Sequence, residues 1–222
     1  MELEDVFEKM ANNALLTRQE KDFLRLKGRE IQQRIAQTAN YTDQNGNLKL
    51  TLPIRTLYSE ALTINTASVT VEVPGGYSHL FLMGSGRTTS NNPSYPIQDV
   101  YAQFNGDTGN NYDWGSLRQG GTTVDAIQSL ATSAVLVGAF STDAADANRS
   151  GGFFSFIPNY GNTLWHKDVF TLRGAAHNGI FTRFTGGFWK STAAIQKIKF
   201  YPDTGVGGNF SAGSLFTVIG VL

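Results

Sequence analysis

The stretch FNGDTGNNYDW, residues 104–114, places two carboxylates among asparagines and glycines. Asp107 and Asp113 could supply charged oxygens to Ca²⁺ and the asparagines neutral ones, but no glutamate stands at the twelfth position that an EF-hand loop requires. Gly106 and the Asn and Asp residues also favour the backbone conformations of a tight turn. A hairpin loop between two strands explains every residue type here, and calcium binding is the alternative.

The remaining polar residues form no recognisable catalytic set. His166 and Asp168 alternate along a predicted strand and would share a face, but no third ligand follows at metal-binding spacing. Motifs for phosphate-binding loops, nucleophile elbows and zinc peptidases are missing from the sequence. Glu60 and Glu72 are the only glutamates after residue 40, so a glycosidase would need an Asp pair assembled by folding. We therefore expect a protein that is not an enzyme and uses no cofactor or metal.

Several aromatic residues near predicted turns could bind a glycan by stacking. The candidates for glycan contact are Tyr160, Trp165 and Trp189, with Phe188 beside the last of them. Aromatic rings of this kind more often lie in the core or in a subunit interface.

The bulk composition narrows the classes of partner. The 222 residues carry no net charge and no cysteine. Without a basic surplus there is no indication of binding to nucleic acid or to an anionic membrane, and disulfides are excluded. No apolar run reaches the roughly 18 residues of a membrane helix, so we expect a soluble protein made in the cytosol.

The chain divides into parts of unlike composition. Residues 1–40 hold seven of the 18 Lys and Arg residues, seven of the 18 Asp and Glu residues, and one of the 24 glycines. Residues 41–222 hold the other glycines and all six prolines. Such a shift is typical of a boundary between structural units, here a helical one followed by a β domain.

Residues 1–38 carry apolar side chains at alternating steps of four and three, the heptad spacing of helices that pack along a seam. The seam has flaws at Thr17, Lys21 and Gly28, and Thr17 with Glu20 fits a capping box at a helix start. One kinked helix and two successive helices both fit. The stripe either packs on the chain's own β domain or mediates self-association or docking, which we favour. The predicted docking residues are Phe7, Met10, Leu24, Ile31 and Ile35.

Residues 39–59 are predicted to link the helical segment to the β domain through a short β-hairpin. Asn45-Gly46 favours a tight turn. The alternating leucines that follow favour a short edge strand, which Pro53 would end.

Residues 60–222 are a succession of about nine short apolar or alternating runs bounded by turn residues. One of them alternates through Val69, Val71 and Val73. With no helical pattern between the runs, the sequence predicts a mainly β fold, an antiparallel, jelly-roll-like β-sandwich preceded by the α-helical segment. The final run FTVIGVL is apolar enough to be a central strand.

The β domain resembles a family of small virion proteins of tailed bacteriophages. The resemblance covers residues from about 60 to 222 and is carried by FNGDTGNNYDW, FSFIPNYGNT, GGFWKSTAAIQKIKFYPDTG and NFSAGSLFTVIGV, in that order. The last two pieces are the most specific. The charged, heptad-like segment in front departs from the usual pattern of the family, whose members often begin directly with the sandwich.

The resemblance implies a single β-sandwich module similar in kind to tail-fibre tips, head fibres and capsid decoration domains, which are commonly trimeric. It brings no catalytic residues. We therefore expect a structural virion protein, a homotrimer exposed on the particle as capsid decoration or head fibre. Its N-terminal segment would contact other capsid or tail proteins. The alternative is a tail-borne tip for host attachment that binds a surface carbohydrate.

Overall fold

A computed structural model describes residues 54–120, 122–177 and 179–222. The chain divides between residues 52 and 53, so this range is essentially the second of its two units. The helical segment predicted for residues 1–38 lies outside the described residues, as does the part of the linker before residue 54. The predicted docking residues Phe7, Met10, Leu24, Ile31 and Ile35 are among those outside.

Twelve strands and no helix form the regular structure of the described residues, which confirms the mainly β prediction. In chain order the strands are β1 (Ile54–Ala61), β2 (Val69–Glu72), β3 (His79–Thr88), β4 (Ile97–Phe104), β5 (Tyr112–Gly120), β6 (Thr123–Thr132), β7 (Val135–Thr142), β8 (Gly151–Ile157), β9 (Lys167–Ala176), β10 (Ile180–Trp189), β11 (Lys197–Pro202) and β12 (Leu215–Val221). Within this part of the chain, no helix has the length and hydropathy to cross a membrane.

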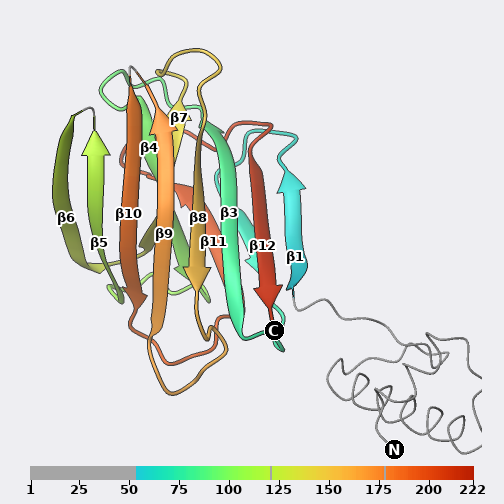
Figure 1. Cartoon of the computed structure of the whole chain (residues 1–222). Helices are drawn as coiled ribbons and strands as arrows, with labels where there is room; N and C mark the ends of the chain where they lie inside the picture. Colours follow the sequence, from blue (N-terminus) through green and yellow to red (C-terminus); the bar gives the residue numbers. More distant parts are fainter. Residues whose placement is uncertain (1–53, 121, 178) are drawn as a thin grey trace, which may run out of the picture. The chain divides into compact units, whose positions relative to one another are not determined.

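The strands form one mixed sheet with two sections. The broad section runs in the order β6–β5–β10–β9–β8–β3–β12–β1, and the narrow section in the order β2–β11–β4–β7. All strand pairs are antiparallel except β3 and β7, which meet in parallel at Arg87 and Thr88. Figure 1 shows the narrow section as a second layer behind the broad one.

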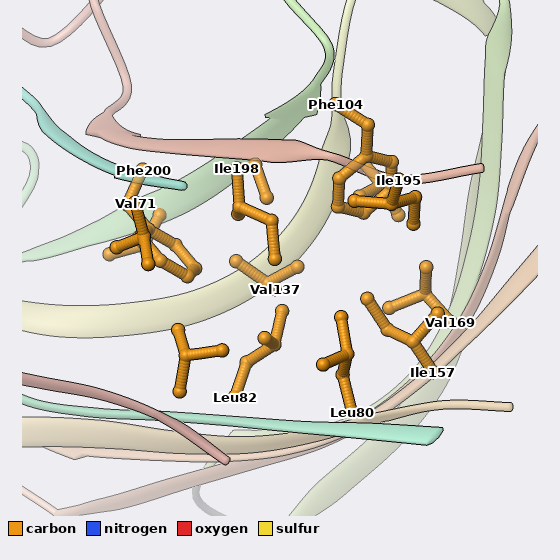
Figure 2. Packing of buried hydrophobic residues seen from close by; sticks show 14 of the residues in the cluster. Val71, Leu80, Leu82, Phe104, Val137, Ile157, Val169, Ile195, Ile198 and Phe200 are labelled. Carbon is orange, nitrogen blue, oxygen red and sulfur yellow. The ribbon is translucent and has the colours of Figure 1, made fainter. Parts of the chain in front are cut away.

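The core fills the space between the two layers. Leu80 and Leu82 of β3 are fully buried and point toward Val137 of β7 and Ile198 of β11 (Figure 2). Most of these strands bury alternate side chains, because successive residues of a strand point to opposite faces, but all eight residues of β7 are buried. Burial of one such side chain stabilises the fold by about 1.5–3 kcal/mol.

The last strand is central, as predicted from its apolar sequence. Strand β12 lies between β1 and β3 and pairs with both. Its partner β1 contains residues 54–59, which the sequence analysis placed in the linker. The sheet therefore begins at Ile54, and the first and last strands of the described unit are neighbours.

Candidate functional site

The outer face of the broad section, which points away from the narrow section, is unusually apolar. In β9, Arg173 points inward and is buried, whereas Phe170 and Leu172 point outward and are exposed. The same inversion occurs in β10, where Arg183 is inside and Phe184 outside. A sheet with one solvated face normally shows the opposite alternation, apolar inside and polar outside.

Strand register lines these outward residues up across the sheet. Phe184 of β10 has two cross-strand neighbours, Leu117 of β5 on one side and Leu172 of β9 on the other. Leu172 is paired with Phe154 of β8, and Phe154 with Met83 of β3. These five residues are called the apolar row. Phe184 is 53% exposed and Leu172 is 56% exposed, although neighbours on both sides flank them.

A second row lies beside the first on the same face. Phe170, Phe156, Phe81 and Ile219 are successive cross-strand neighbours from β9 to β12. The ring of Phe81 lies 5.1 Å from that of Phe154 and 5.2 Å from that of Phe156, centroid to centroid. Neither row contains a charged residue, so this face presents a continuous aromatic and aliphatic surface.

On its other side the apolar row is bordered by small residues. Thr182, Gly174, Gly152 and Ser85 are cross-strand neighbours from β10 to β3. With Ile180 and adjoining residues they line a shallow hollow of about 370 Å³, here called the glycine hollow. A ridge of large side chains and a depression therefore lie side by side on one face.

The inner face of the same strands carries an arginine row. Arg118, Arg183 and Arg173 are cross-strand neighbours on β5, β10 and β9. Like charges placed directly opposite one another destabilise a sheet unless they have partners. Asp125 on β6 forms an ion pair with Arg118 at the exposed end of the row. Asp99 on β4, in the other layer, is the carboxylate for the other two.

Asp99 holds the buried end of the arginine row. Its Oδ1 accepts a hydrogen bond of 2.6 Å from Arg173 Nη1, which also donates to Gly138 O at 2.7 Å. Its Oδ2 lies 3.7 Å from Arg183 Nη1. Burial lowers the pKa of Arg173, against the opposing effect of Asp99, and lowers the pKa of Arg183 to about 10. This cluster links the two layers, because Asp99 of the narrow section contacts two arginines of the broad section. Its role is therefore structural.

The loop at residues 105–111 is a turn, but it is not a hairpin. Strand β4 before it lies in the narrow section, and β5 after it lies in the broad section, so the prediction of a hairpin was wrong. The loop instead carries the chain from one layer to the other. Asn105 and Gly106 adopt the left-handed backbone conformation, with φ of 53° and 72°, which Asn and Gly accommodate best. Composition identified the turn but could not reveal which strands pair.

Asp107 organises this loop through hydrogen bonds. It accepts hydrogen bonds from the Trp189 indole at 2.7 Å, the Gly109 amide at 2.9 Å and the Asn111 amide group at 3.0 Å. Burial favours the neutral acid, but these three donors outweigh it and hold the pKa of Asp107 below its usual value. Donation from three groups stabilises the ionised carboxylate.

Asp113 has different partners. Its Oδ1 accepts from the Ala131 amide at 2.6 Å and from Lys190 Nζ at 2.9 Å, and both lower the pKa of Asp113. In the part of the chain that the structure describes, no group of three or more His, Asp or Glu residues is placed to hold a metal ion. The two acids that suggested calcium therefore serve two separate structural contacts.

The three predicted glycan contacts have different environments. Tyr160 is 1% exposed and donates from its hydroxyl to Pro74 O at 2.6 Å. Trp189 is 2% exposed and stacks on Tyr112 in the core. Neither ring has a face free for a sugar. Trp165 is 71% exposed, so it is the one of the three that stays a candidate.

A pocket of about 680 Å³ lies where three connections meet at one end of the sheet. It is lined by residues 72–78, 159–162 and 194–196, which bring together Tyr77 and neutral amides such as Asn159 and Gln196. Backbone hydrogen bonds join the connections, from Val73 N to Gln196 O at 2.7 Å and from Ile195 N to Tyr160 O at 3.0 Å. The volume lies within the range of small-molecule sites, about 300–1,000 Å³.

The other residues singled out from the sequence lie apart from this pocket's lining. His166 is exposed just before β9, where Asp168 points to the outer face. The residue between them, Lys167, is buried and donates to the carbonyl oxygens of Trp165 at 2.8 Å and Thr192 at 3.2 Å. Burial lowers the pKa of Lys167. Its bonds join two connections and hold the loop that carries Trp165.

Comparison with models of known protein families and with curated proteins finds no match for this chain. Its function is therefore inferred from its own surface and sequence.

Proposed function

We propose that this chain is a non-enzymatic structural protein of a tailed-phage virion. It forms a homotrimer on the particle surface, as capsid decoration or head fibre, and residues 1–38 attach it to other virion proteins. The β domain is a jelly-roll-like sandwich. This proposal combines the sequence resemblance with one structural observation, the apolar outer face of the broad section.

The outer face supports an assembly role because of its size and composition. The largest apolar patch on a typical monomer is about 300–600 Å², and larger ones usually mark interaction sites. Here two rows of aromatic and aliphatic side chains cross the broad section without a charged residue. Some acids of the described unit, among them Asp99 and Asp107, form structural hydrogen bonds. The domain thus offers a large contact surface rather than a set of reactive groups.

The arrangement of strands supports the jelly-roll-like assignment. Two layers enclose one core, nearly all pairs are antiparallel, and the first and last strands lie together. Such double-layered β domains limit the unpaired edges that promote aggregation.

The experiment that tests the virion role is detection of the protein in purified particles of the phage that encodes it. Heads and tails are separated and analysed by quantitative mass spectrometry, with the major capsid protein as the reference for copy number. We expect the chain in the head fraction, in a multiple of three copies. Its absence from both fractions of intact particles would contradict the proposal.

The alternative, a tail-borne tip that binds a host carbohydrate, is favoured by the pocket at the meeting of the three connections. Neutral amides and aromatic rings are suitable partners for sugar hydroxyls and sugar faces. Asn159 and Asn162 line the pocket, and Trp165 belongs to the same connection and is exposed.

A glycan array distinguishes this alternative. If it holds, the wild type binds a surface glycan, and Trp165→Ala or Asn159→Ala abolishes binding. Leu164→Ala is the matched control, because Leu164 is equally exposed in the same connection. Binding that survives both changes, or no binding by the wild type, counts against a carbohydrate receptor and leaves the decoration role untouched.

A further inference from the structure

We infer that the outer face of the broad section is the surface through which copies of this chain pack on one another, with the apolar row of one copy against the glycine hollow of the next. This inference rests on the proposed function, since it names the partner of the surface on which that function depends. The inference names the surface by which copies of the chain contact one another, whereas the proposed function states that the protein is part of a phage particle.

The size of the face is the first argument. The apolar row and the second row contain four phenylalanines in addition to Phe81, and several rings are about half exposed. An aromatic side chain carries about 150–250 Å² of surface, and about half of it is still exposed in Phe154, Phe170 and Phe184, so with Leu117 and Leu172 the two rows offer on the order of 500 Å² of apolar surface. With the exposed Ile180 and the glycine hollow beside them, one sheet face approaches the roughly 800 Å² that each partner buries in an interface of standard size.

The chemistry of the face is the second argument. A partner with a charged surface would lose hydration of its charges here and find no counter-charge, because neither row contains one. A second copy presents the same uncharged rows. An uncharged surface rich in phenylalanine and methionine has the composition found in the buried core of homodimer interfaces.

The shape of the face is the third argument. On each of four strands the ridge and the hollow are two residues apart, as with Leu172 and Gly174 on β9 or Phe154 and Gly152 on β8. Two residues span about 7 Å along a strand. A ridge and a depression at this spacing let one copy insert its large side chains where the next copy has none. In a closed ring of copies, the ridge of each copy then meets the depression of the next.

The test uses the full chain and its lack of cysteine. Leu172→Cys places one thiol in the centre of the face, and Lys199→Cys places one on the outer side of the narrow section as the control. We expect a short bifunctional maleimide to join copies of the first variant at micromolar concentration and not those of the second. Equal crosslinking in both variants, or none in either, would overturn the inference.

Light scattering of a second pair of variants gives an independent measure. We expect the wild type at three times 24.2 kDa. In the double variant Leu172→Thr with Phe184→Thr we expect association at least about a hundredfold weaker, since two large apolar side chains leave the contact. Threonine suits a strand, so the circular dichroism spectrum should stay unchanged. Lys197→Thr with Lys199→Thr is the control and should keep the wild-type mass.

The remaining outcomes separate this inference from the virion role. A double variant that keeps the wild-type mass overturns the interface but not the presence of an oligomer. A monomeric wild type also overturns it. If that monomer loses residues 1–53 to protease faster once the double substitution is made, the occupant is the chain's own N-terminal segment. Detection of the chain in purified particles is unaffected by any of these results.

Discussion

Strands β11 and β10 alternate with the same period but place opposite chemistry on their two sides. In β11, Ile198 and Phe200 are buried and Lys199 faces solvent. In β10, Arg183 is buried and Phe184 is exposed. Strand β11 therefore has an ordinary solvent side, whereas the outer face of the broad section has the composition of an interior. The difference teaches that two-residue periodicity identifies a strand but does not identify which side meets water.

The inner face of the broad section carries the charged side chains that are missing from the apolar rows of its outer face. Arg173 is fully buried, and its guanidinium is placed between Asp99 and the Gly138 carbonyl. Lys167 is likewise buried against two carbonyl oxygens. A buried charge is tolerated only with such partners. The contrast between the two sections can therefore be tested by measuring the free energy of unfolding of variants with substitutions at buried and at exposed positions.

The largest effect is expected at the buried end of the arginine row. Asp99→Ala leaves Arg173 and Arg183 without a carboxylate and should lower the free energy of unfolding by about 3–5 kcal/mol, as is typical when one partner of a buried pair is removed. Urea unfolding followed by tryptophan fluorescence measures it. Asp125→Ala, at the exposed end of the row, is the control and should leave stability nearly unchanged. Similar losses in both variants would contradict the burial of the row.

A somewhat smaller effect distinguishes the two sides of β11. Ile198→Ala creates a cavity in the core between the layers and should cost about 2–5 kcal/mol. Lys199→Ala, one residue further on, should change the free energy of unfolding by less than about 0.5 kcal/mol. Chemical denaturation of both variants supplies the measurement. A large cost at Lys199 would mean that this side is not a solvent face and would remove the contrast with β10.

The loop that joins the layers should show a moderate, pH-dependent effect. The folded-state pKa of Asp107 is lowered, so its ionisation stabilises the fold above the unfolded-state pKa of about 3.9, and this stabilisation is lost as pH falls through the folded value. Trp189→Phe removes one donor to Asp107 and should cost about 1–3 kcal/mol at neutral pH. The deficit should shrink on acidification to pH 3, as measured by urea unfolding at both pH values. If the loss of stability in Trp189→Phe is the same at both pH values, it arises from packing alone and not from the hydrogen bond to Asp107.

The smallest effect is expected on the outer side of the narrow section. Glu72 and Lys197 form an ion pair of 2.9 Å between β2 and β11, and both side chains are exposed. Glu72→Gln should lower the free energy of unfolding by less than about 1 kcal/mol. Thermal unfolding at low and high salt provides the measurement, because salt screens an exposed pair. A larger cost would indicate that something covers this side as well.

Local features of the fold follow well from the sequence. The predicted alternation of Val69, Val71 and Val73 is buried on one side, and the apolar last strand is central. Gly106 and its neighbours turn the chain as expected. These features depend on short-range constraints, namely side-chain alternation and backbone freedom, which adjacent residues reveal.

Features that depend on pairing between distant segments could not be predicted. Strand β6 was missed because both of its sides are largely polar or exposed, so it lacks an apolar alternation. Trp189 was a candidate glycan contact, yet it is buried and a carboxylate 82 positions away accepts its indole hydrogen. The apolar row is made of residues from five strands whose alignment is set by register alone. No single segment of the sequence contains it.

The pairing of β1 with β12 has a consequence for how the protein is made. Ser59 and Thr217, neighbours across these strands, are 158 positions apart. At a synthesis rate of about 5–20 residues per second, β1 waits on the order of ten seconds for its partner to leave the ribosome. Throughout that time β1 and the β3 edge that β12 will cover are both open to other chains. Newly made protein therefore completes its sheet only after residue 221 emerges, and chaperone protection of these edges matters most when many copies are made at once.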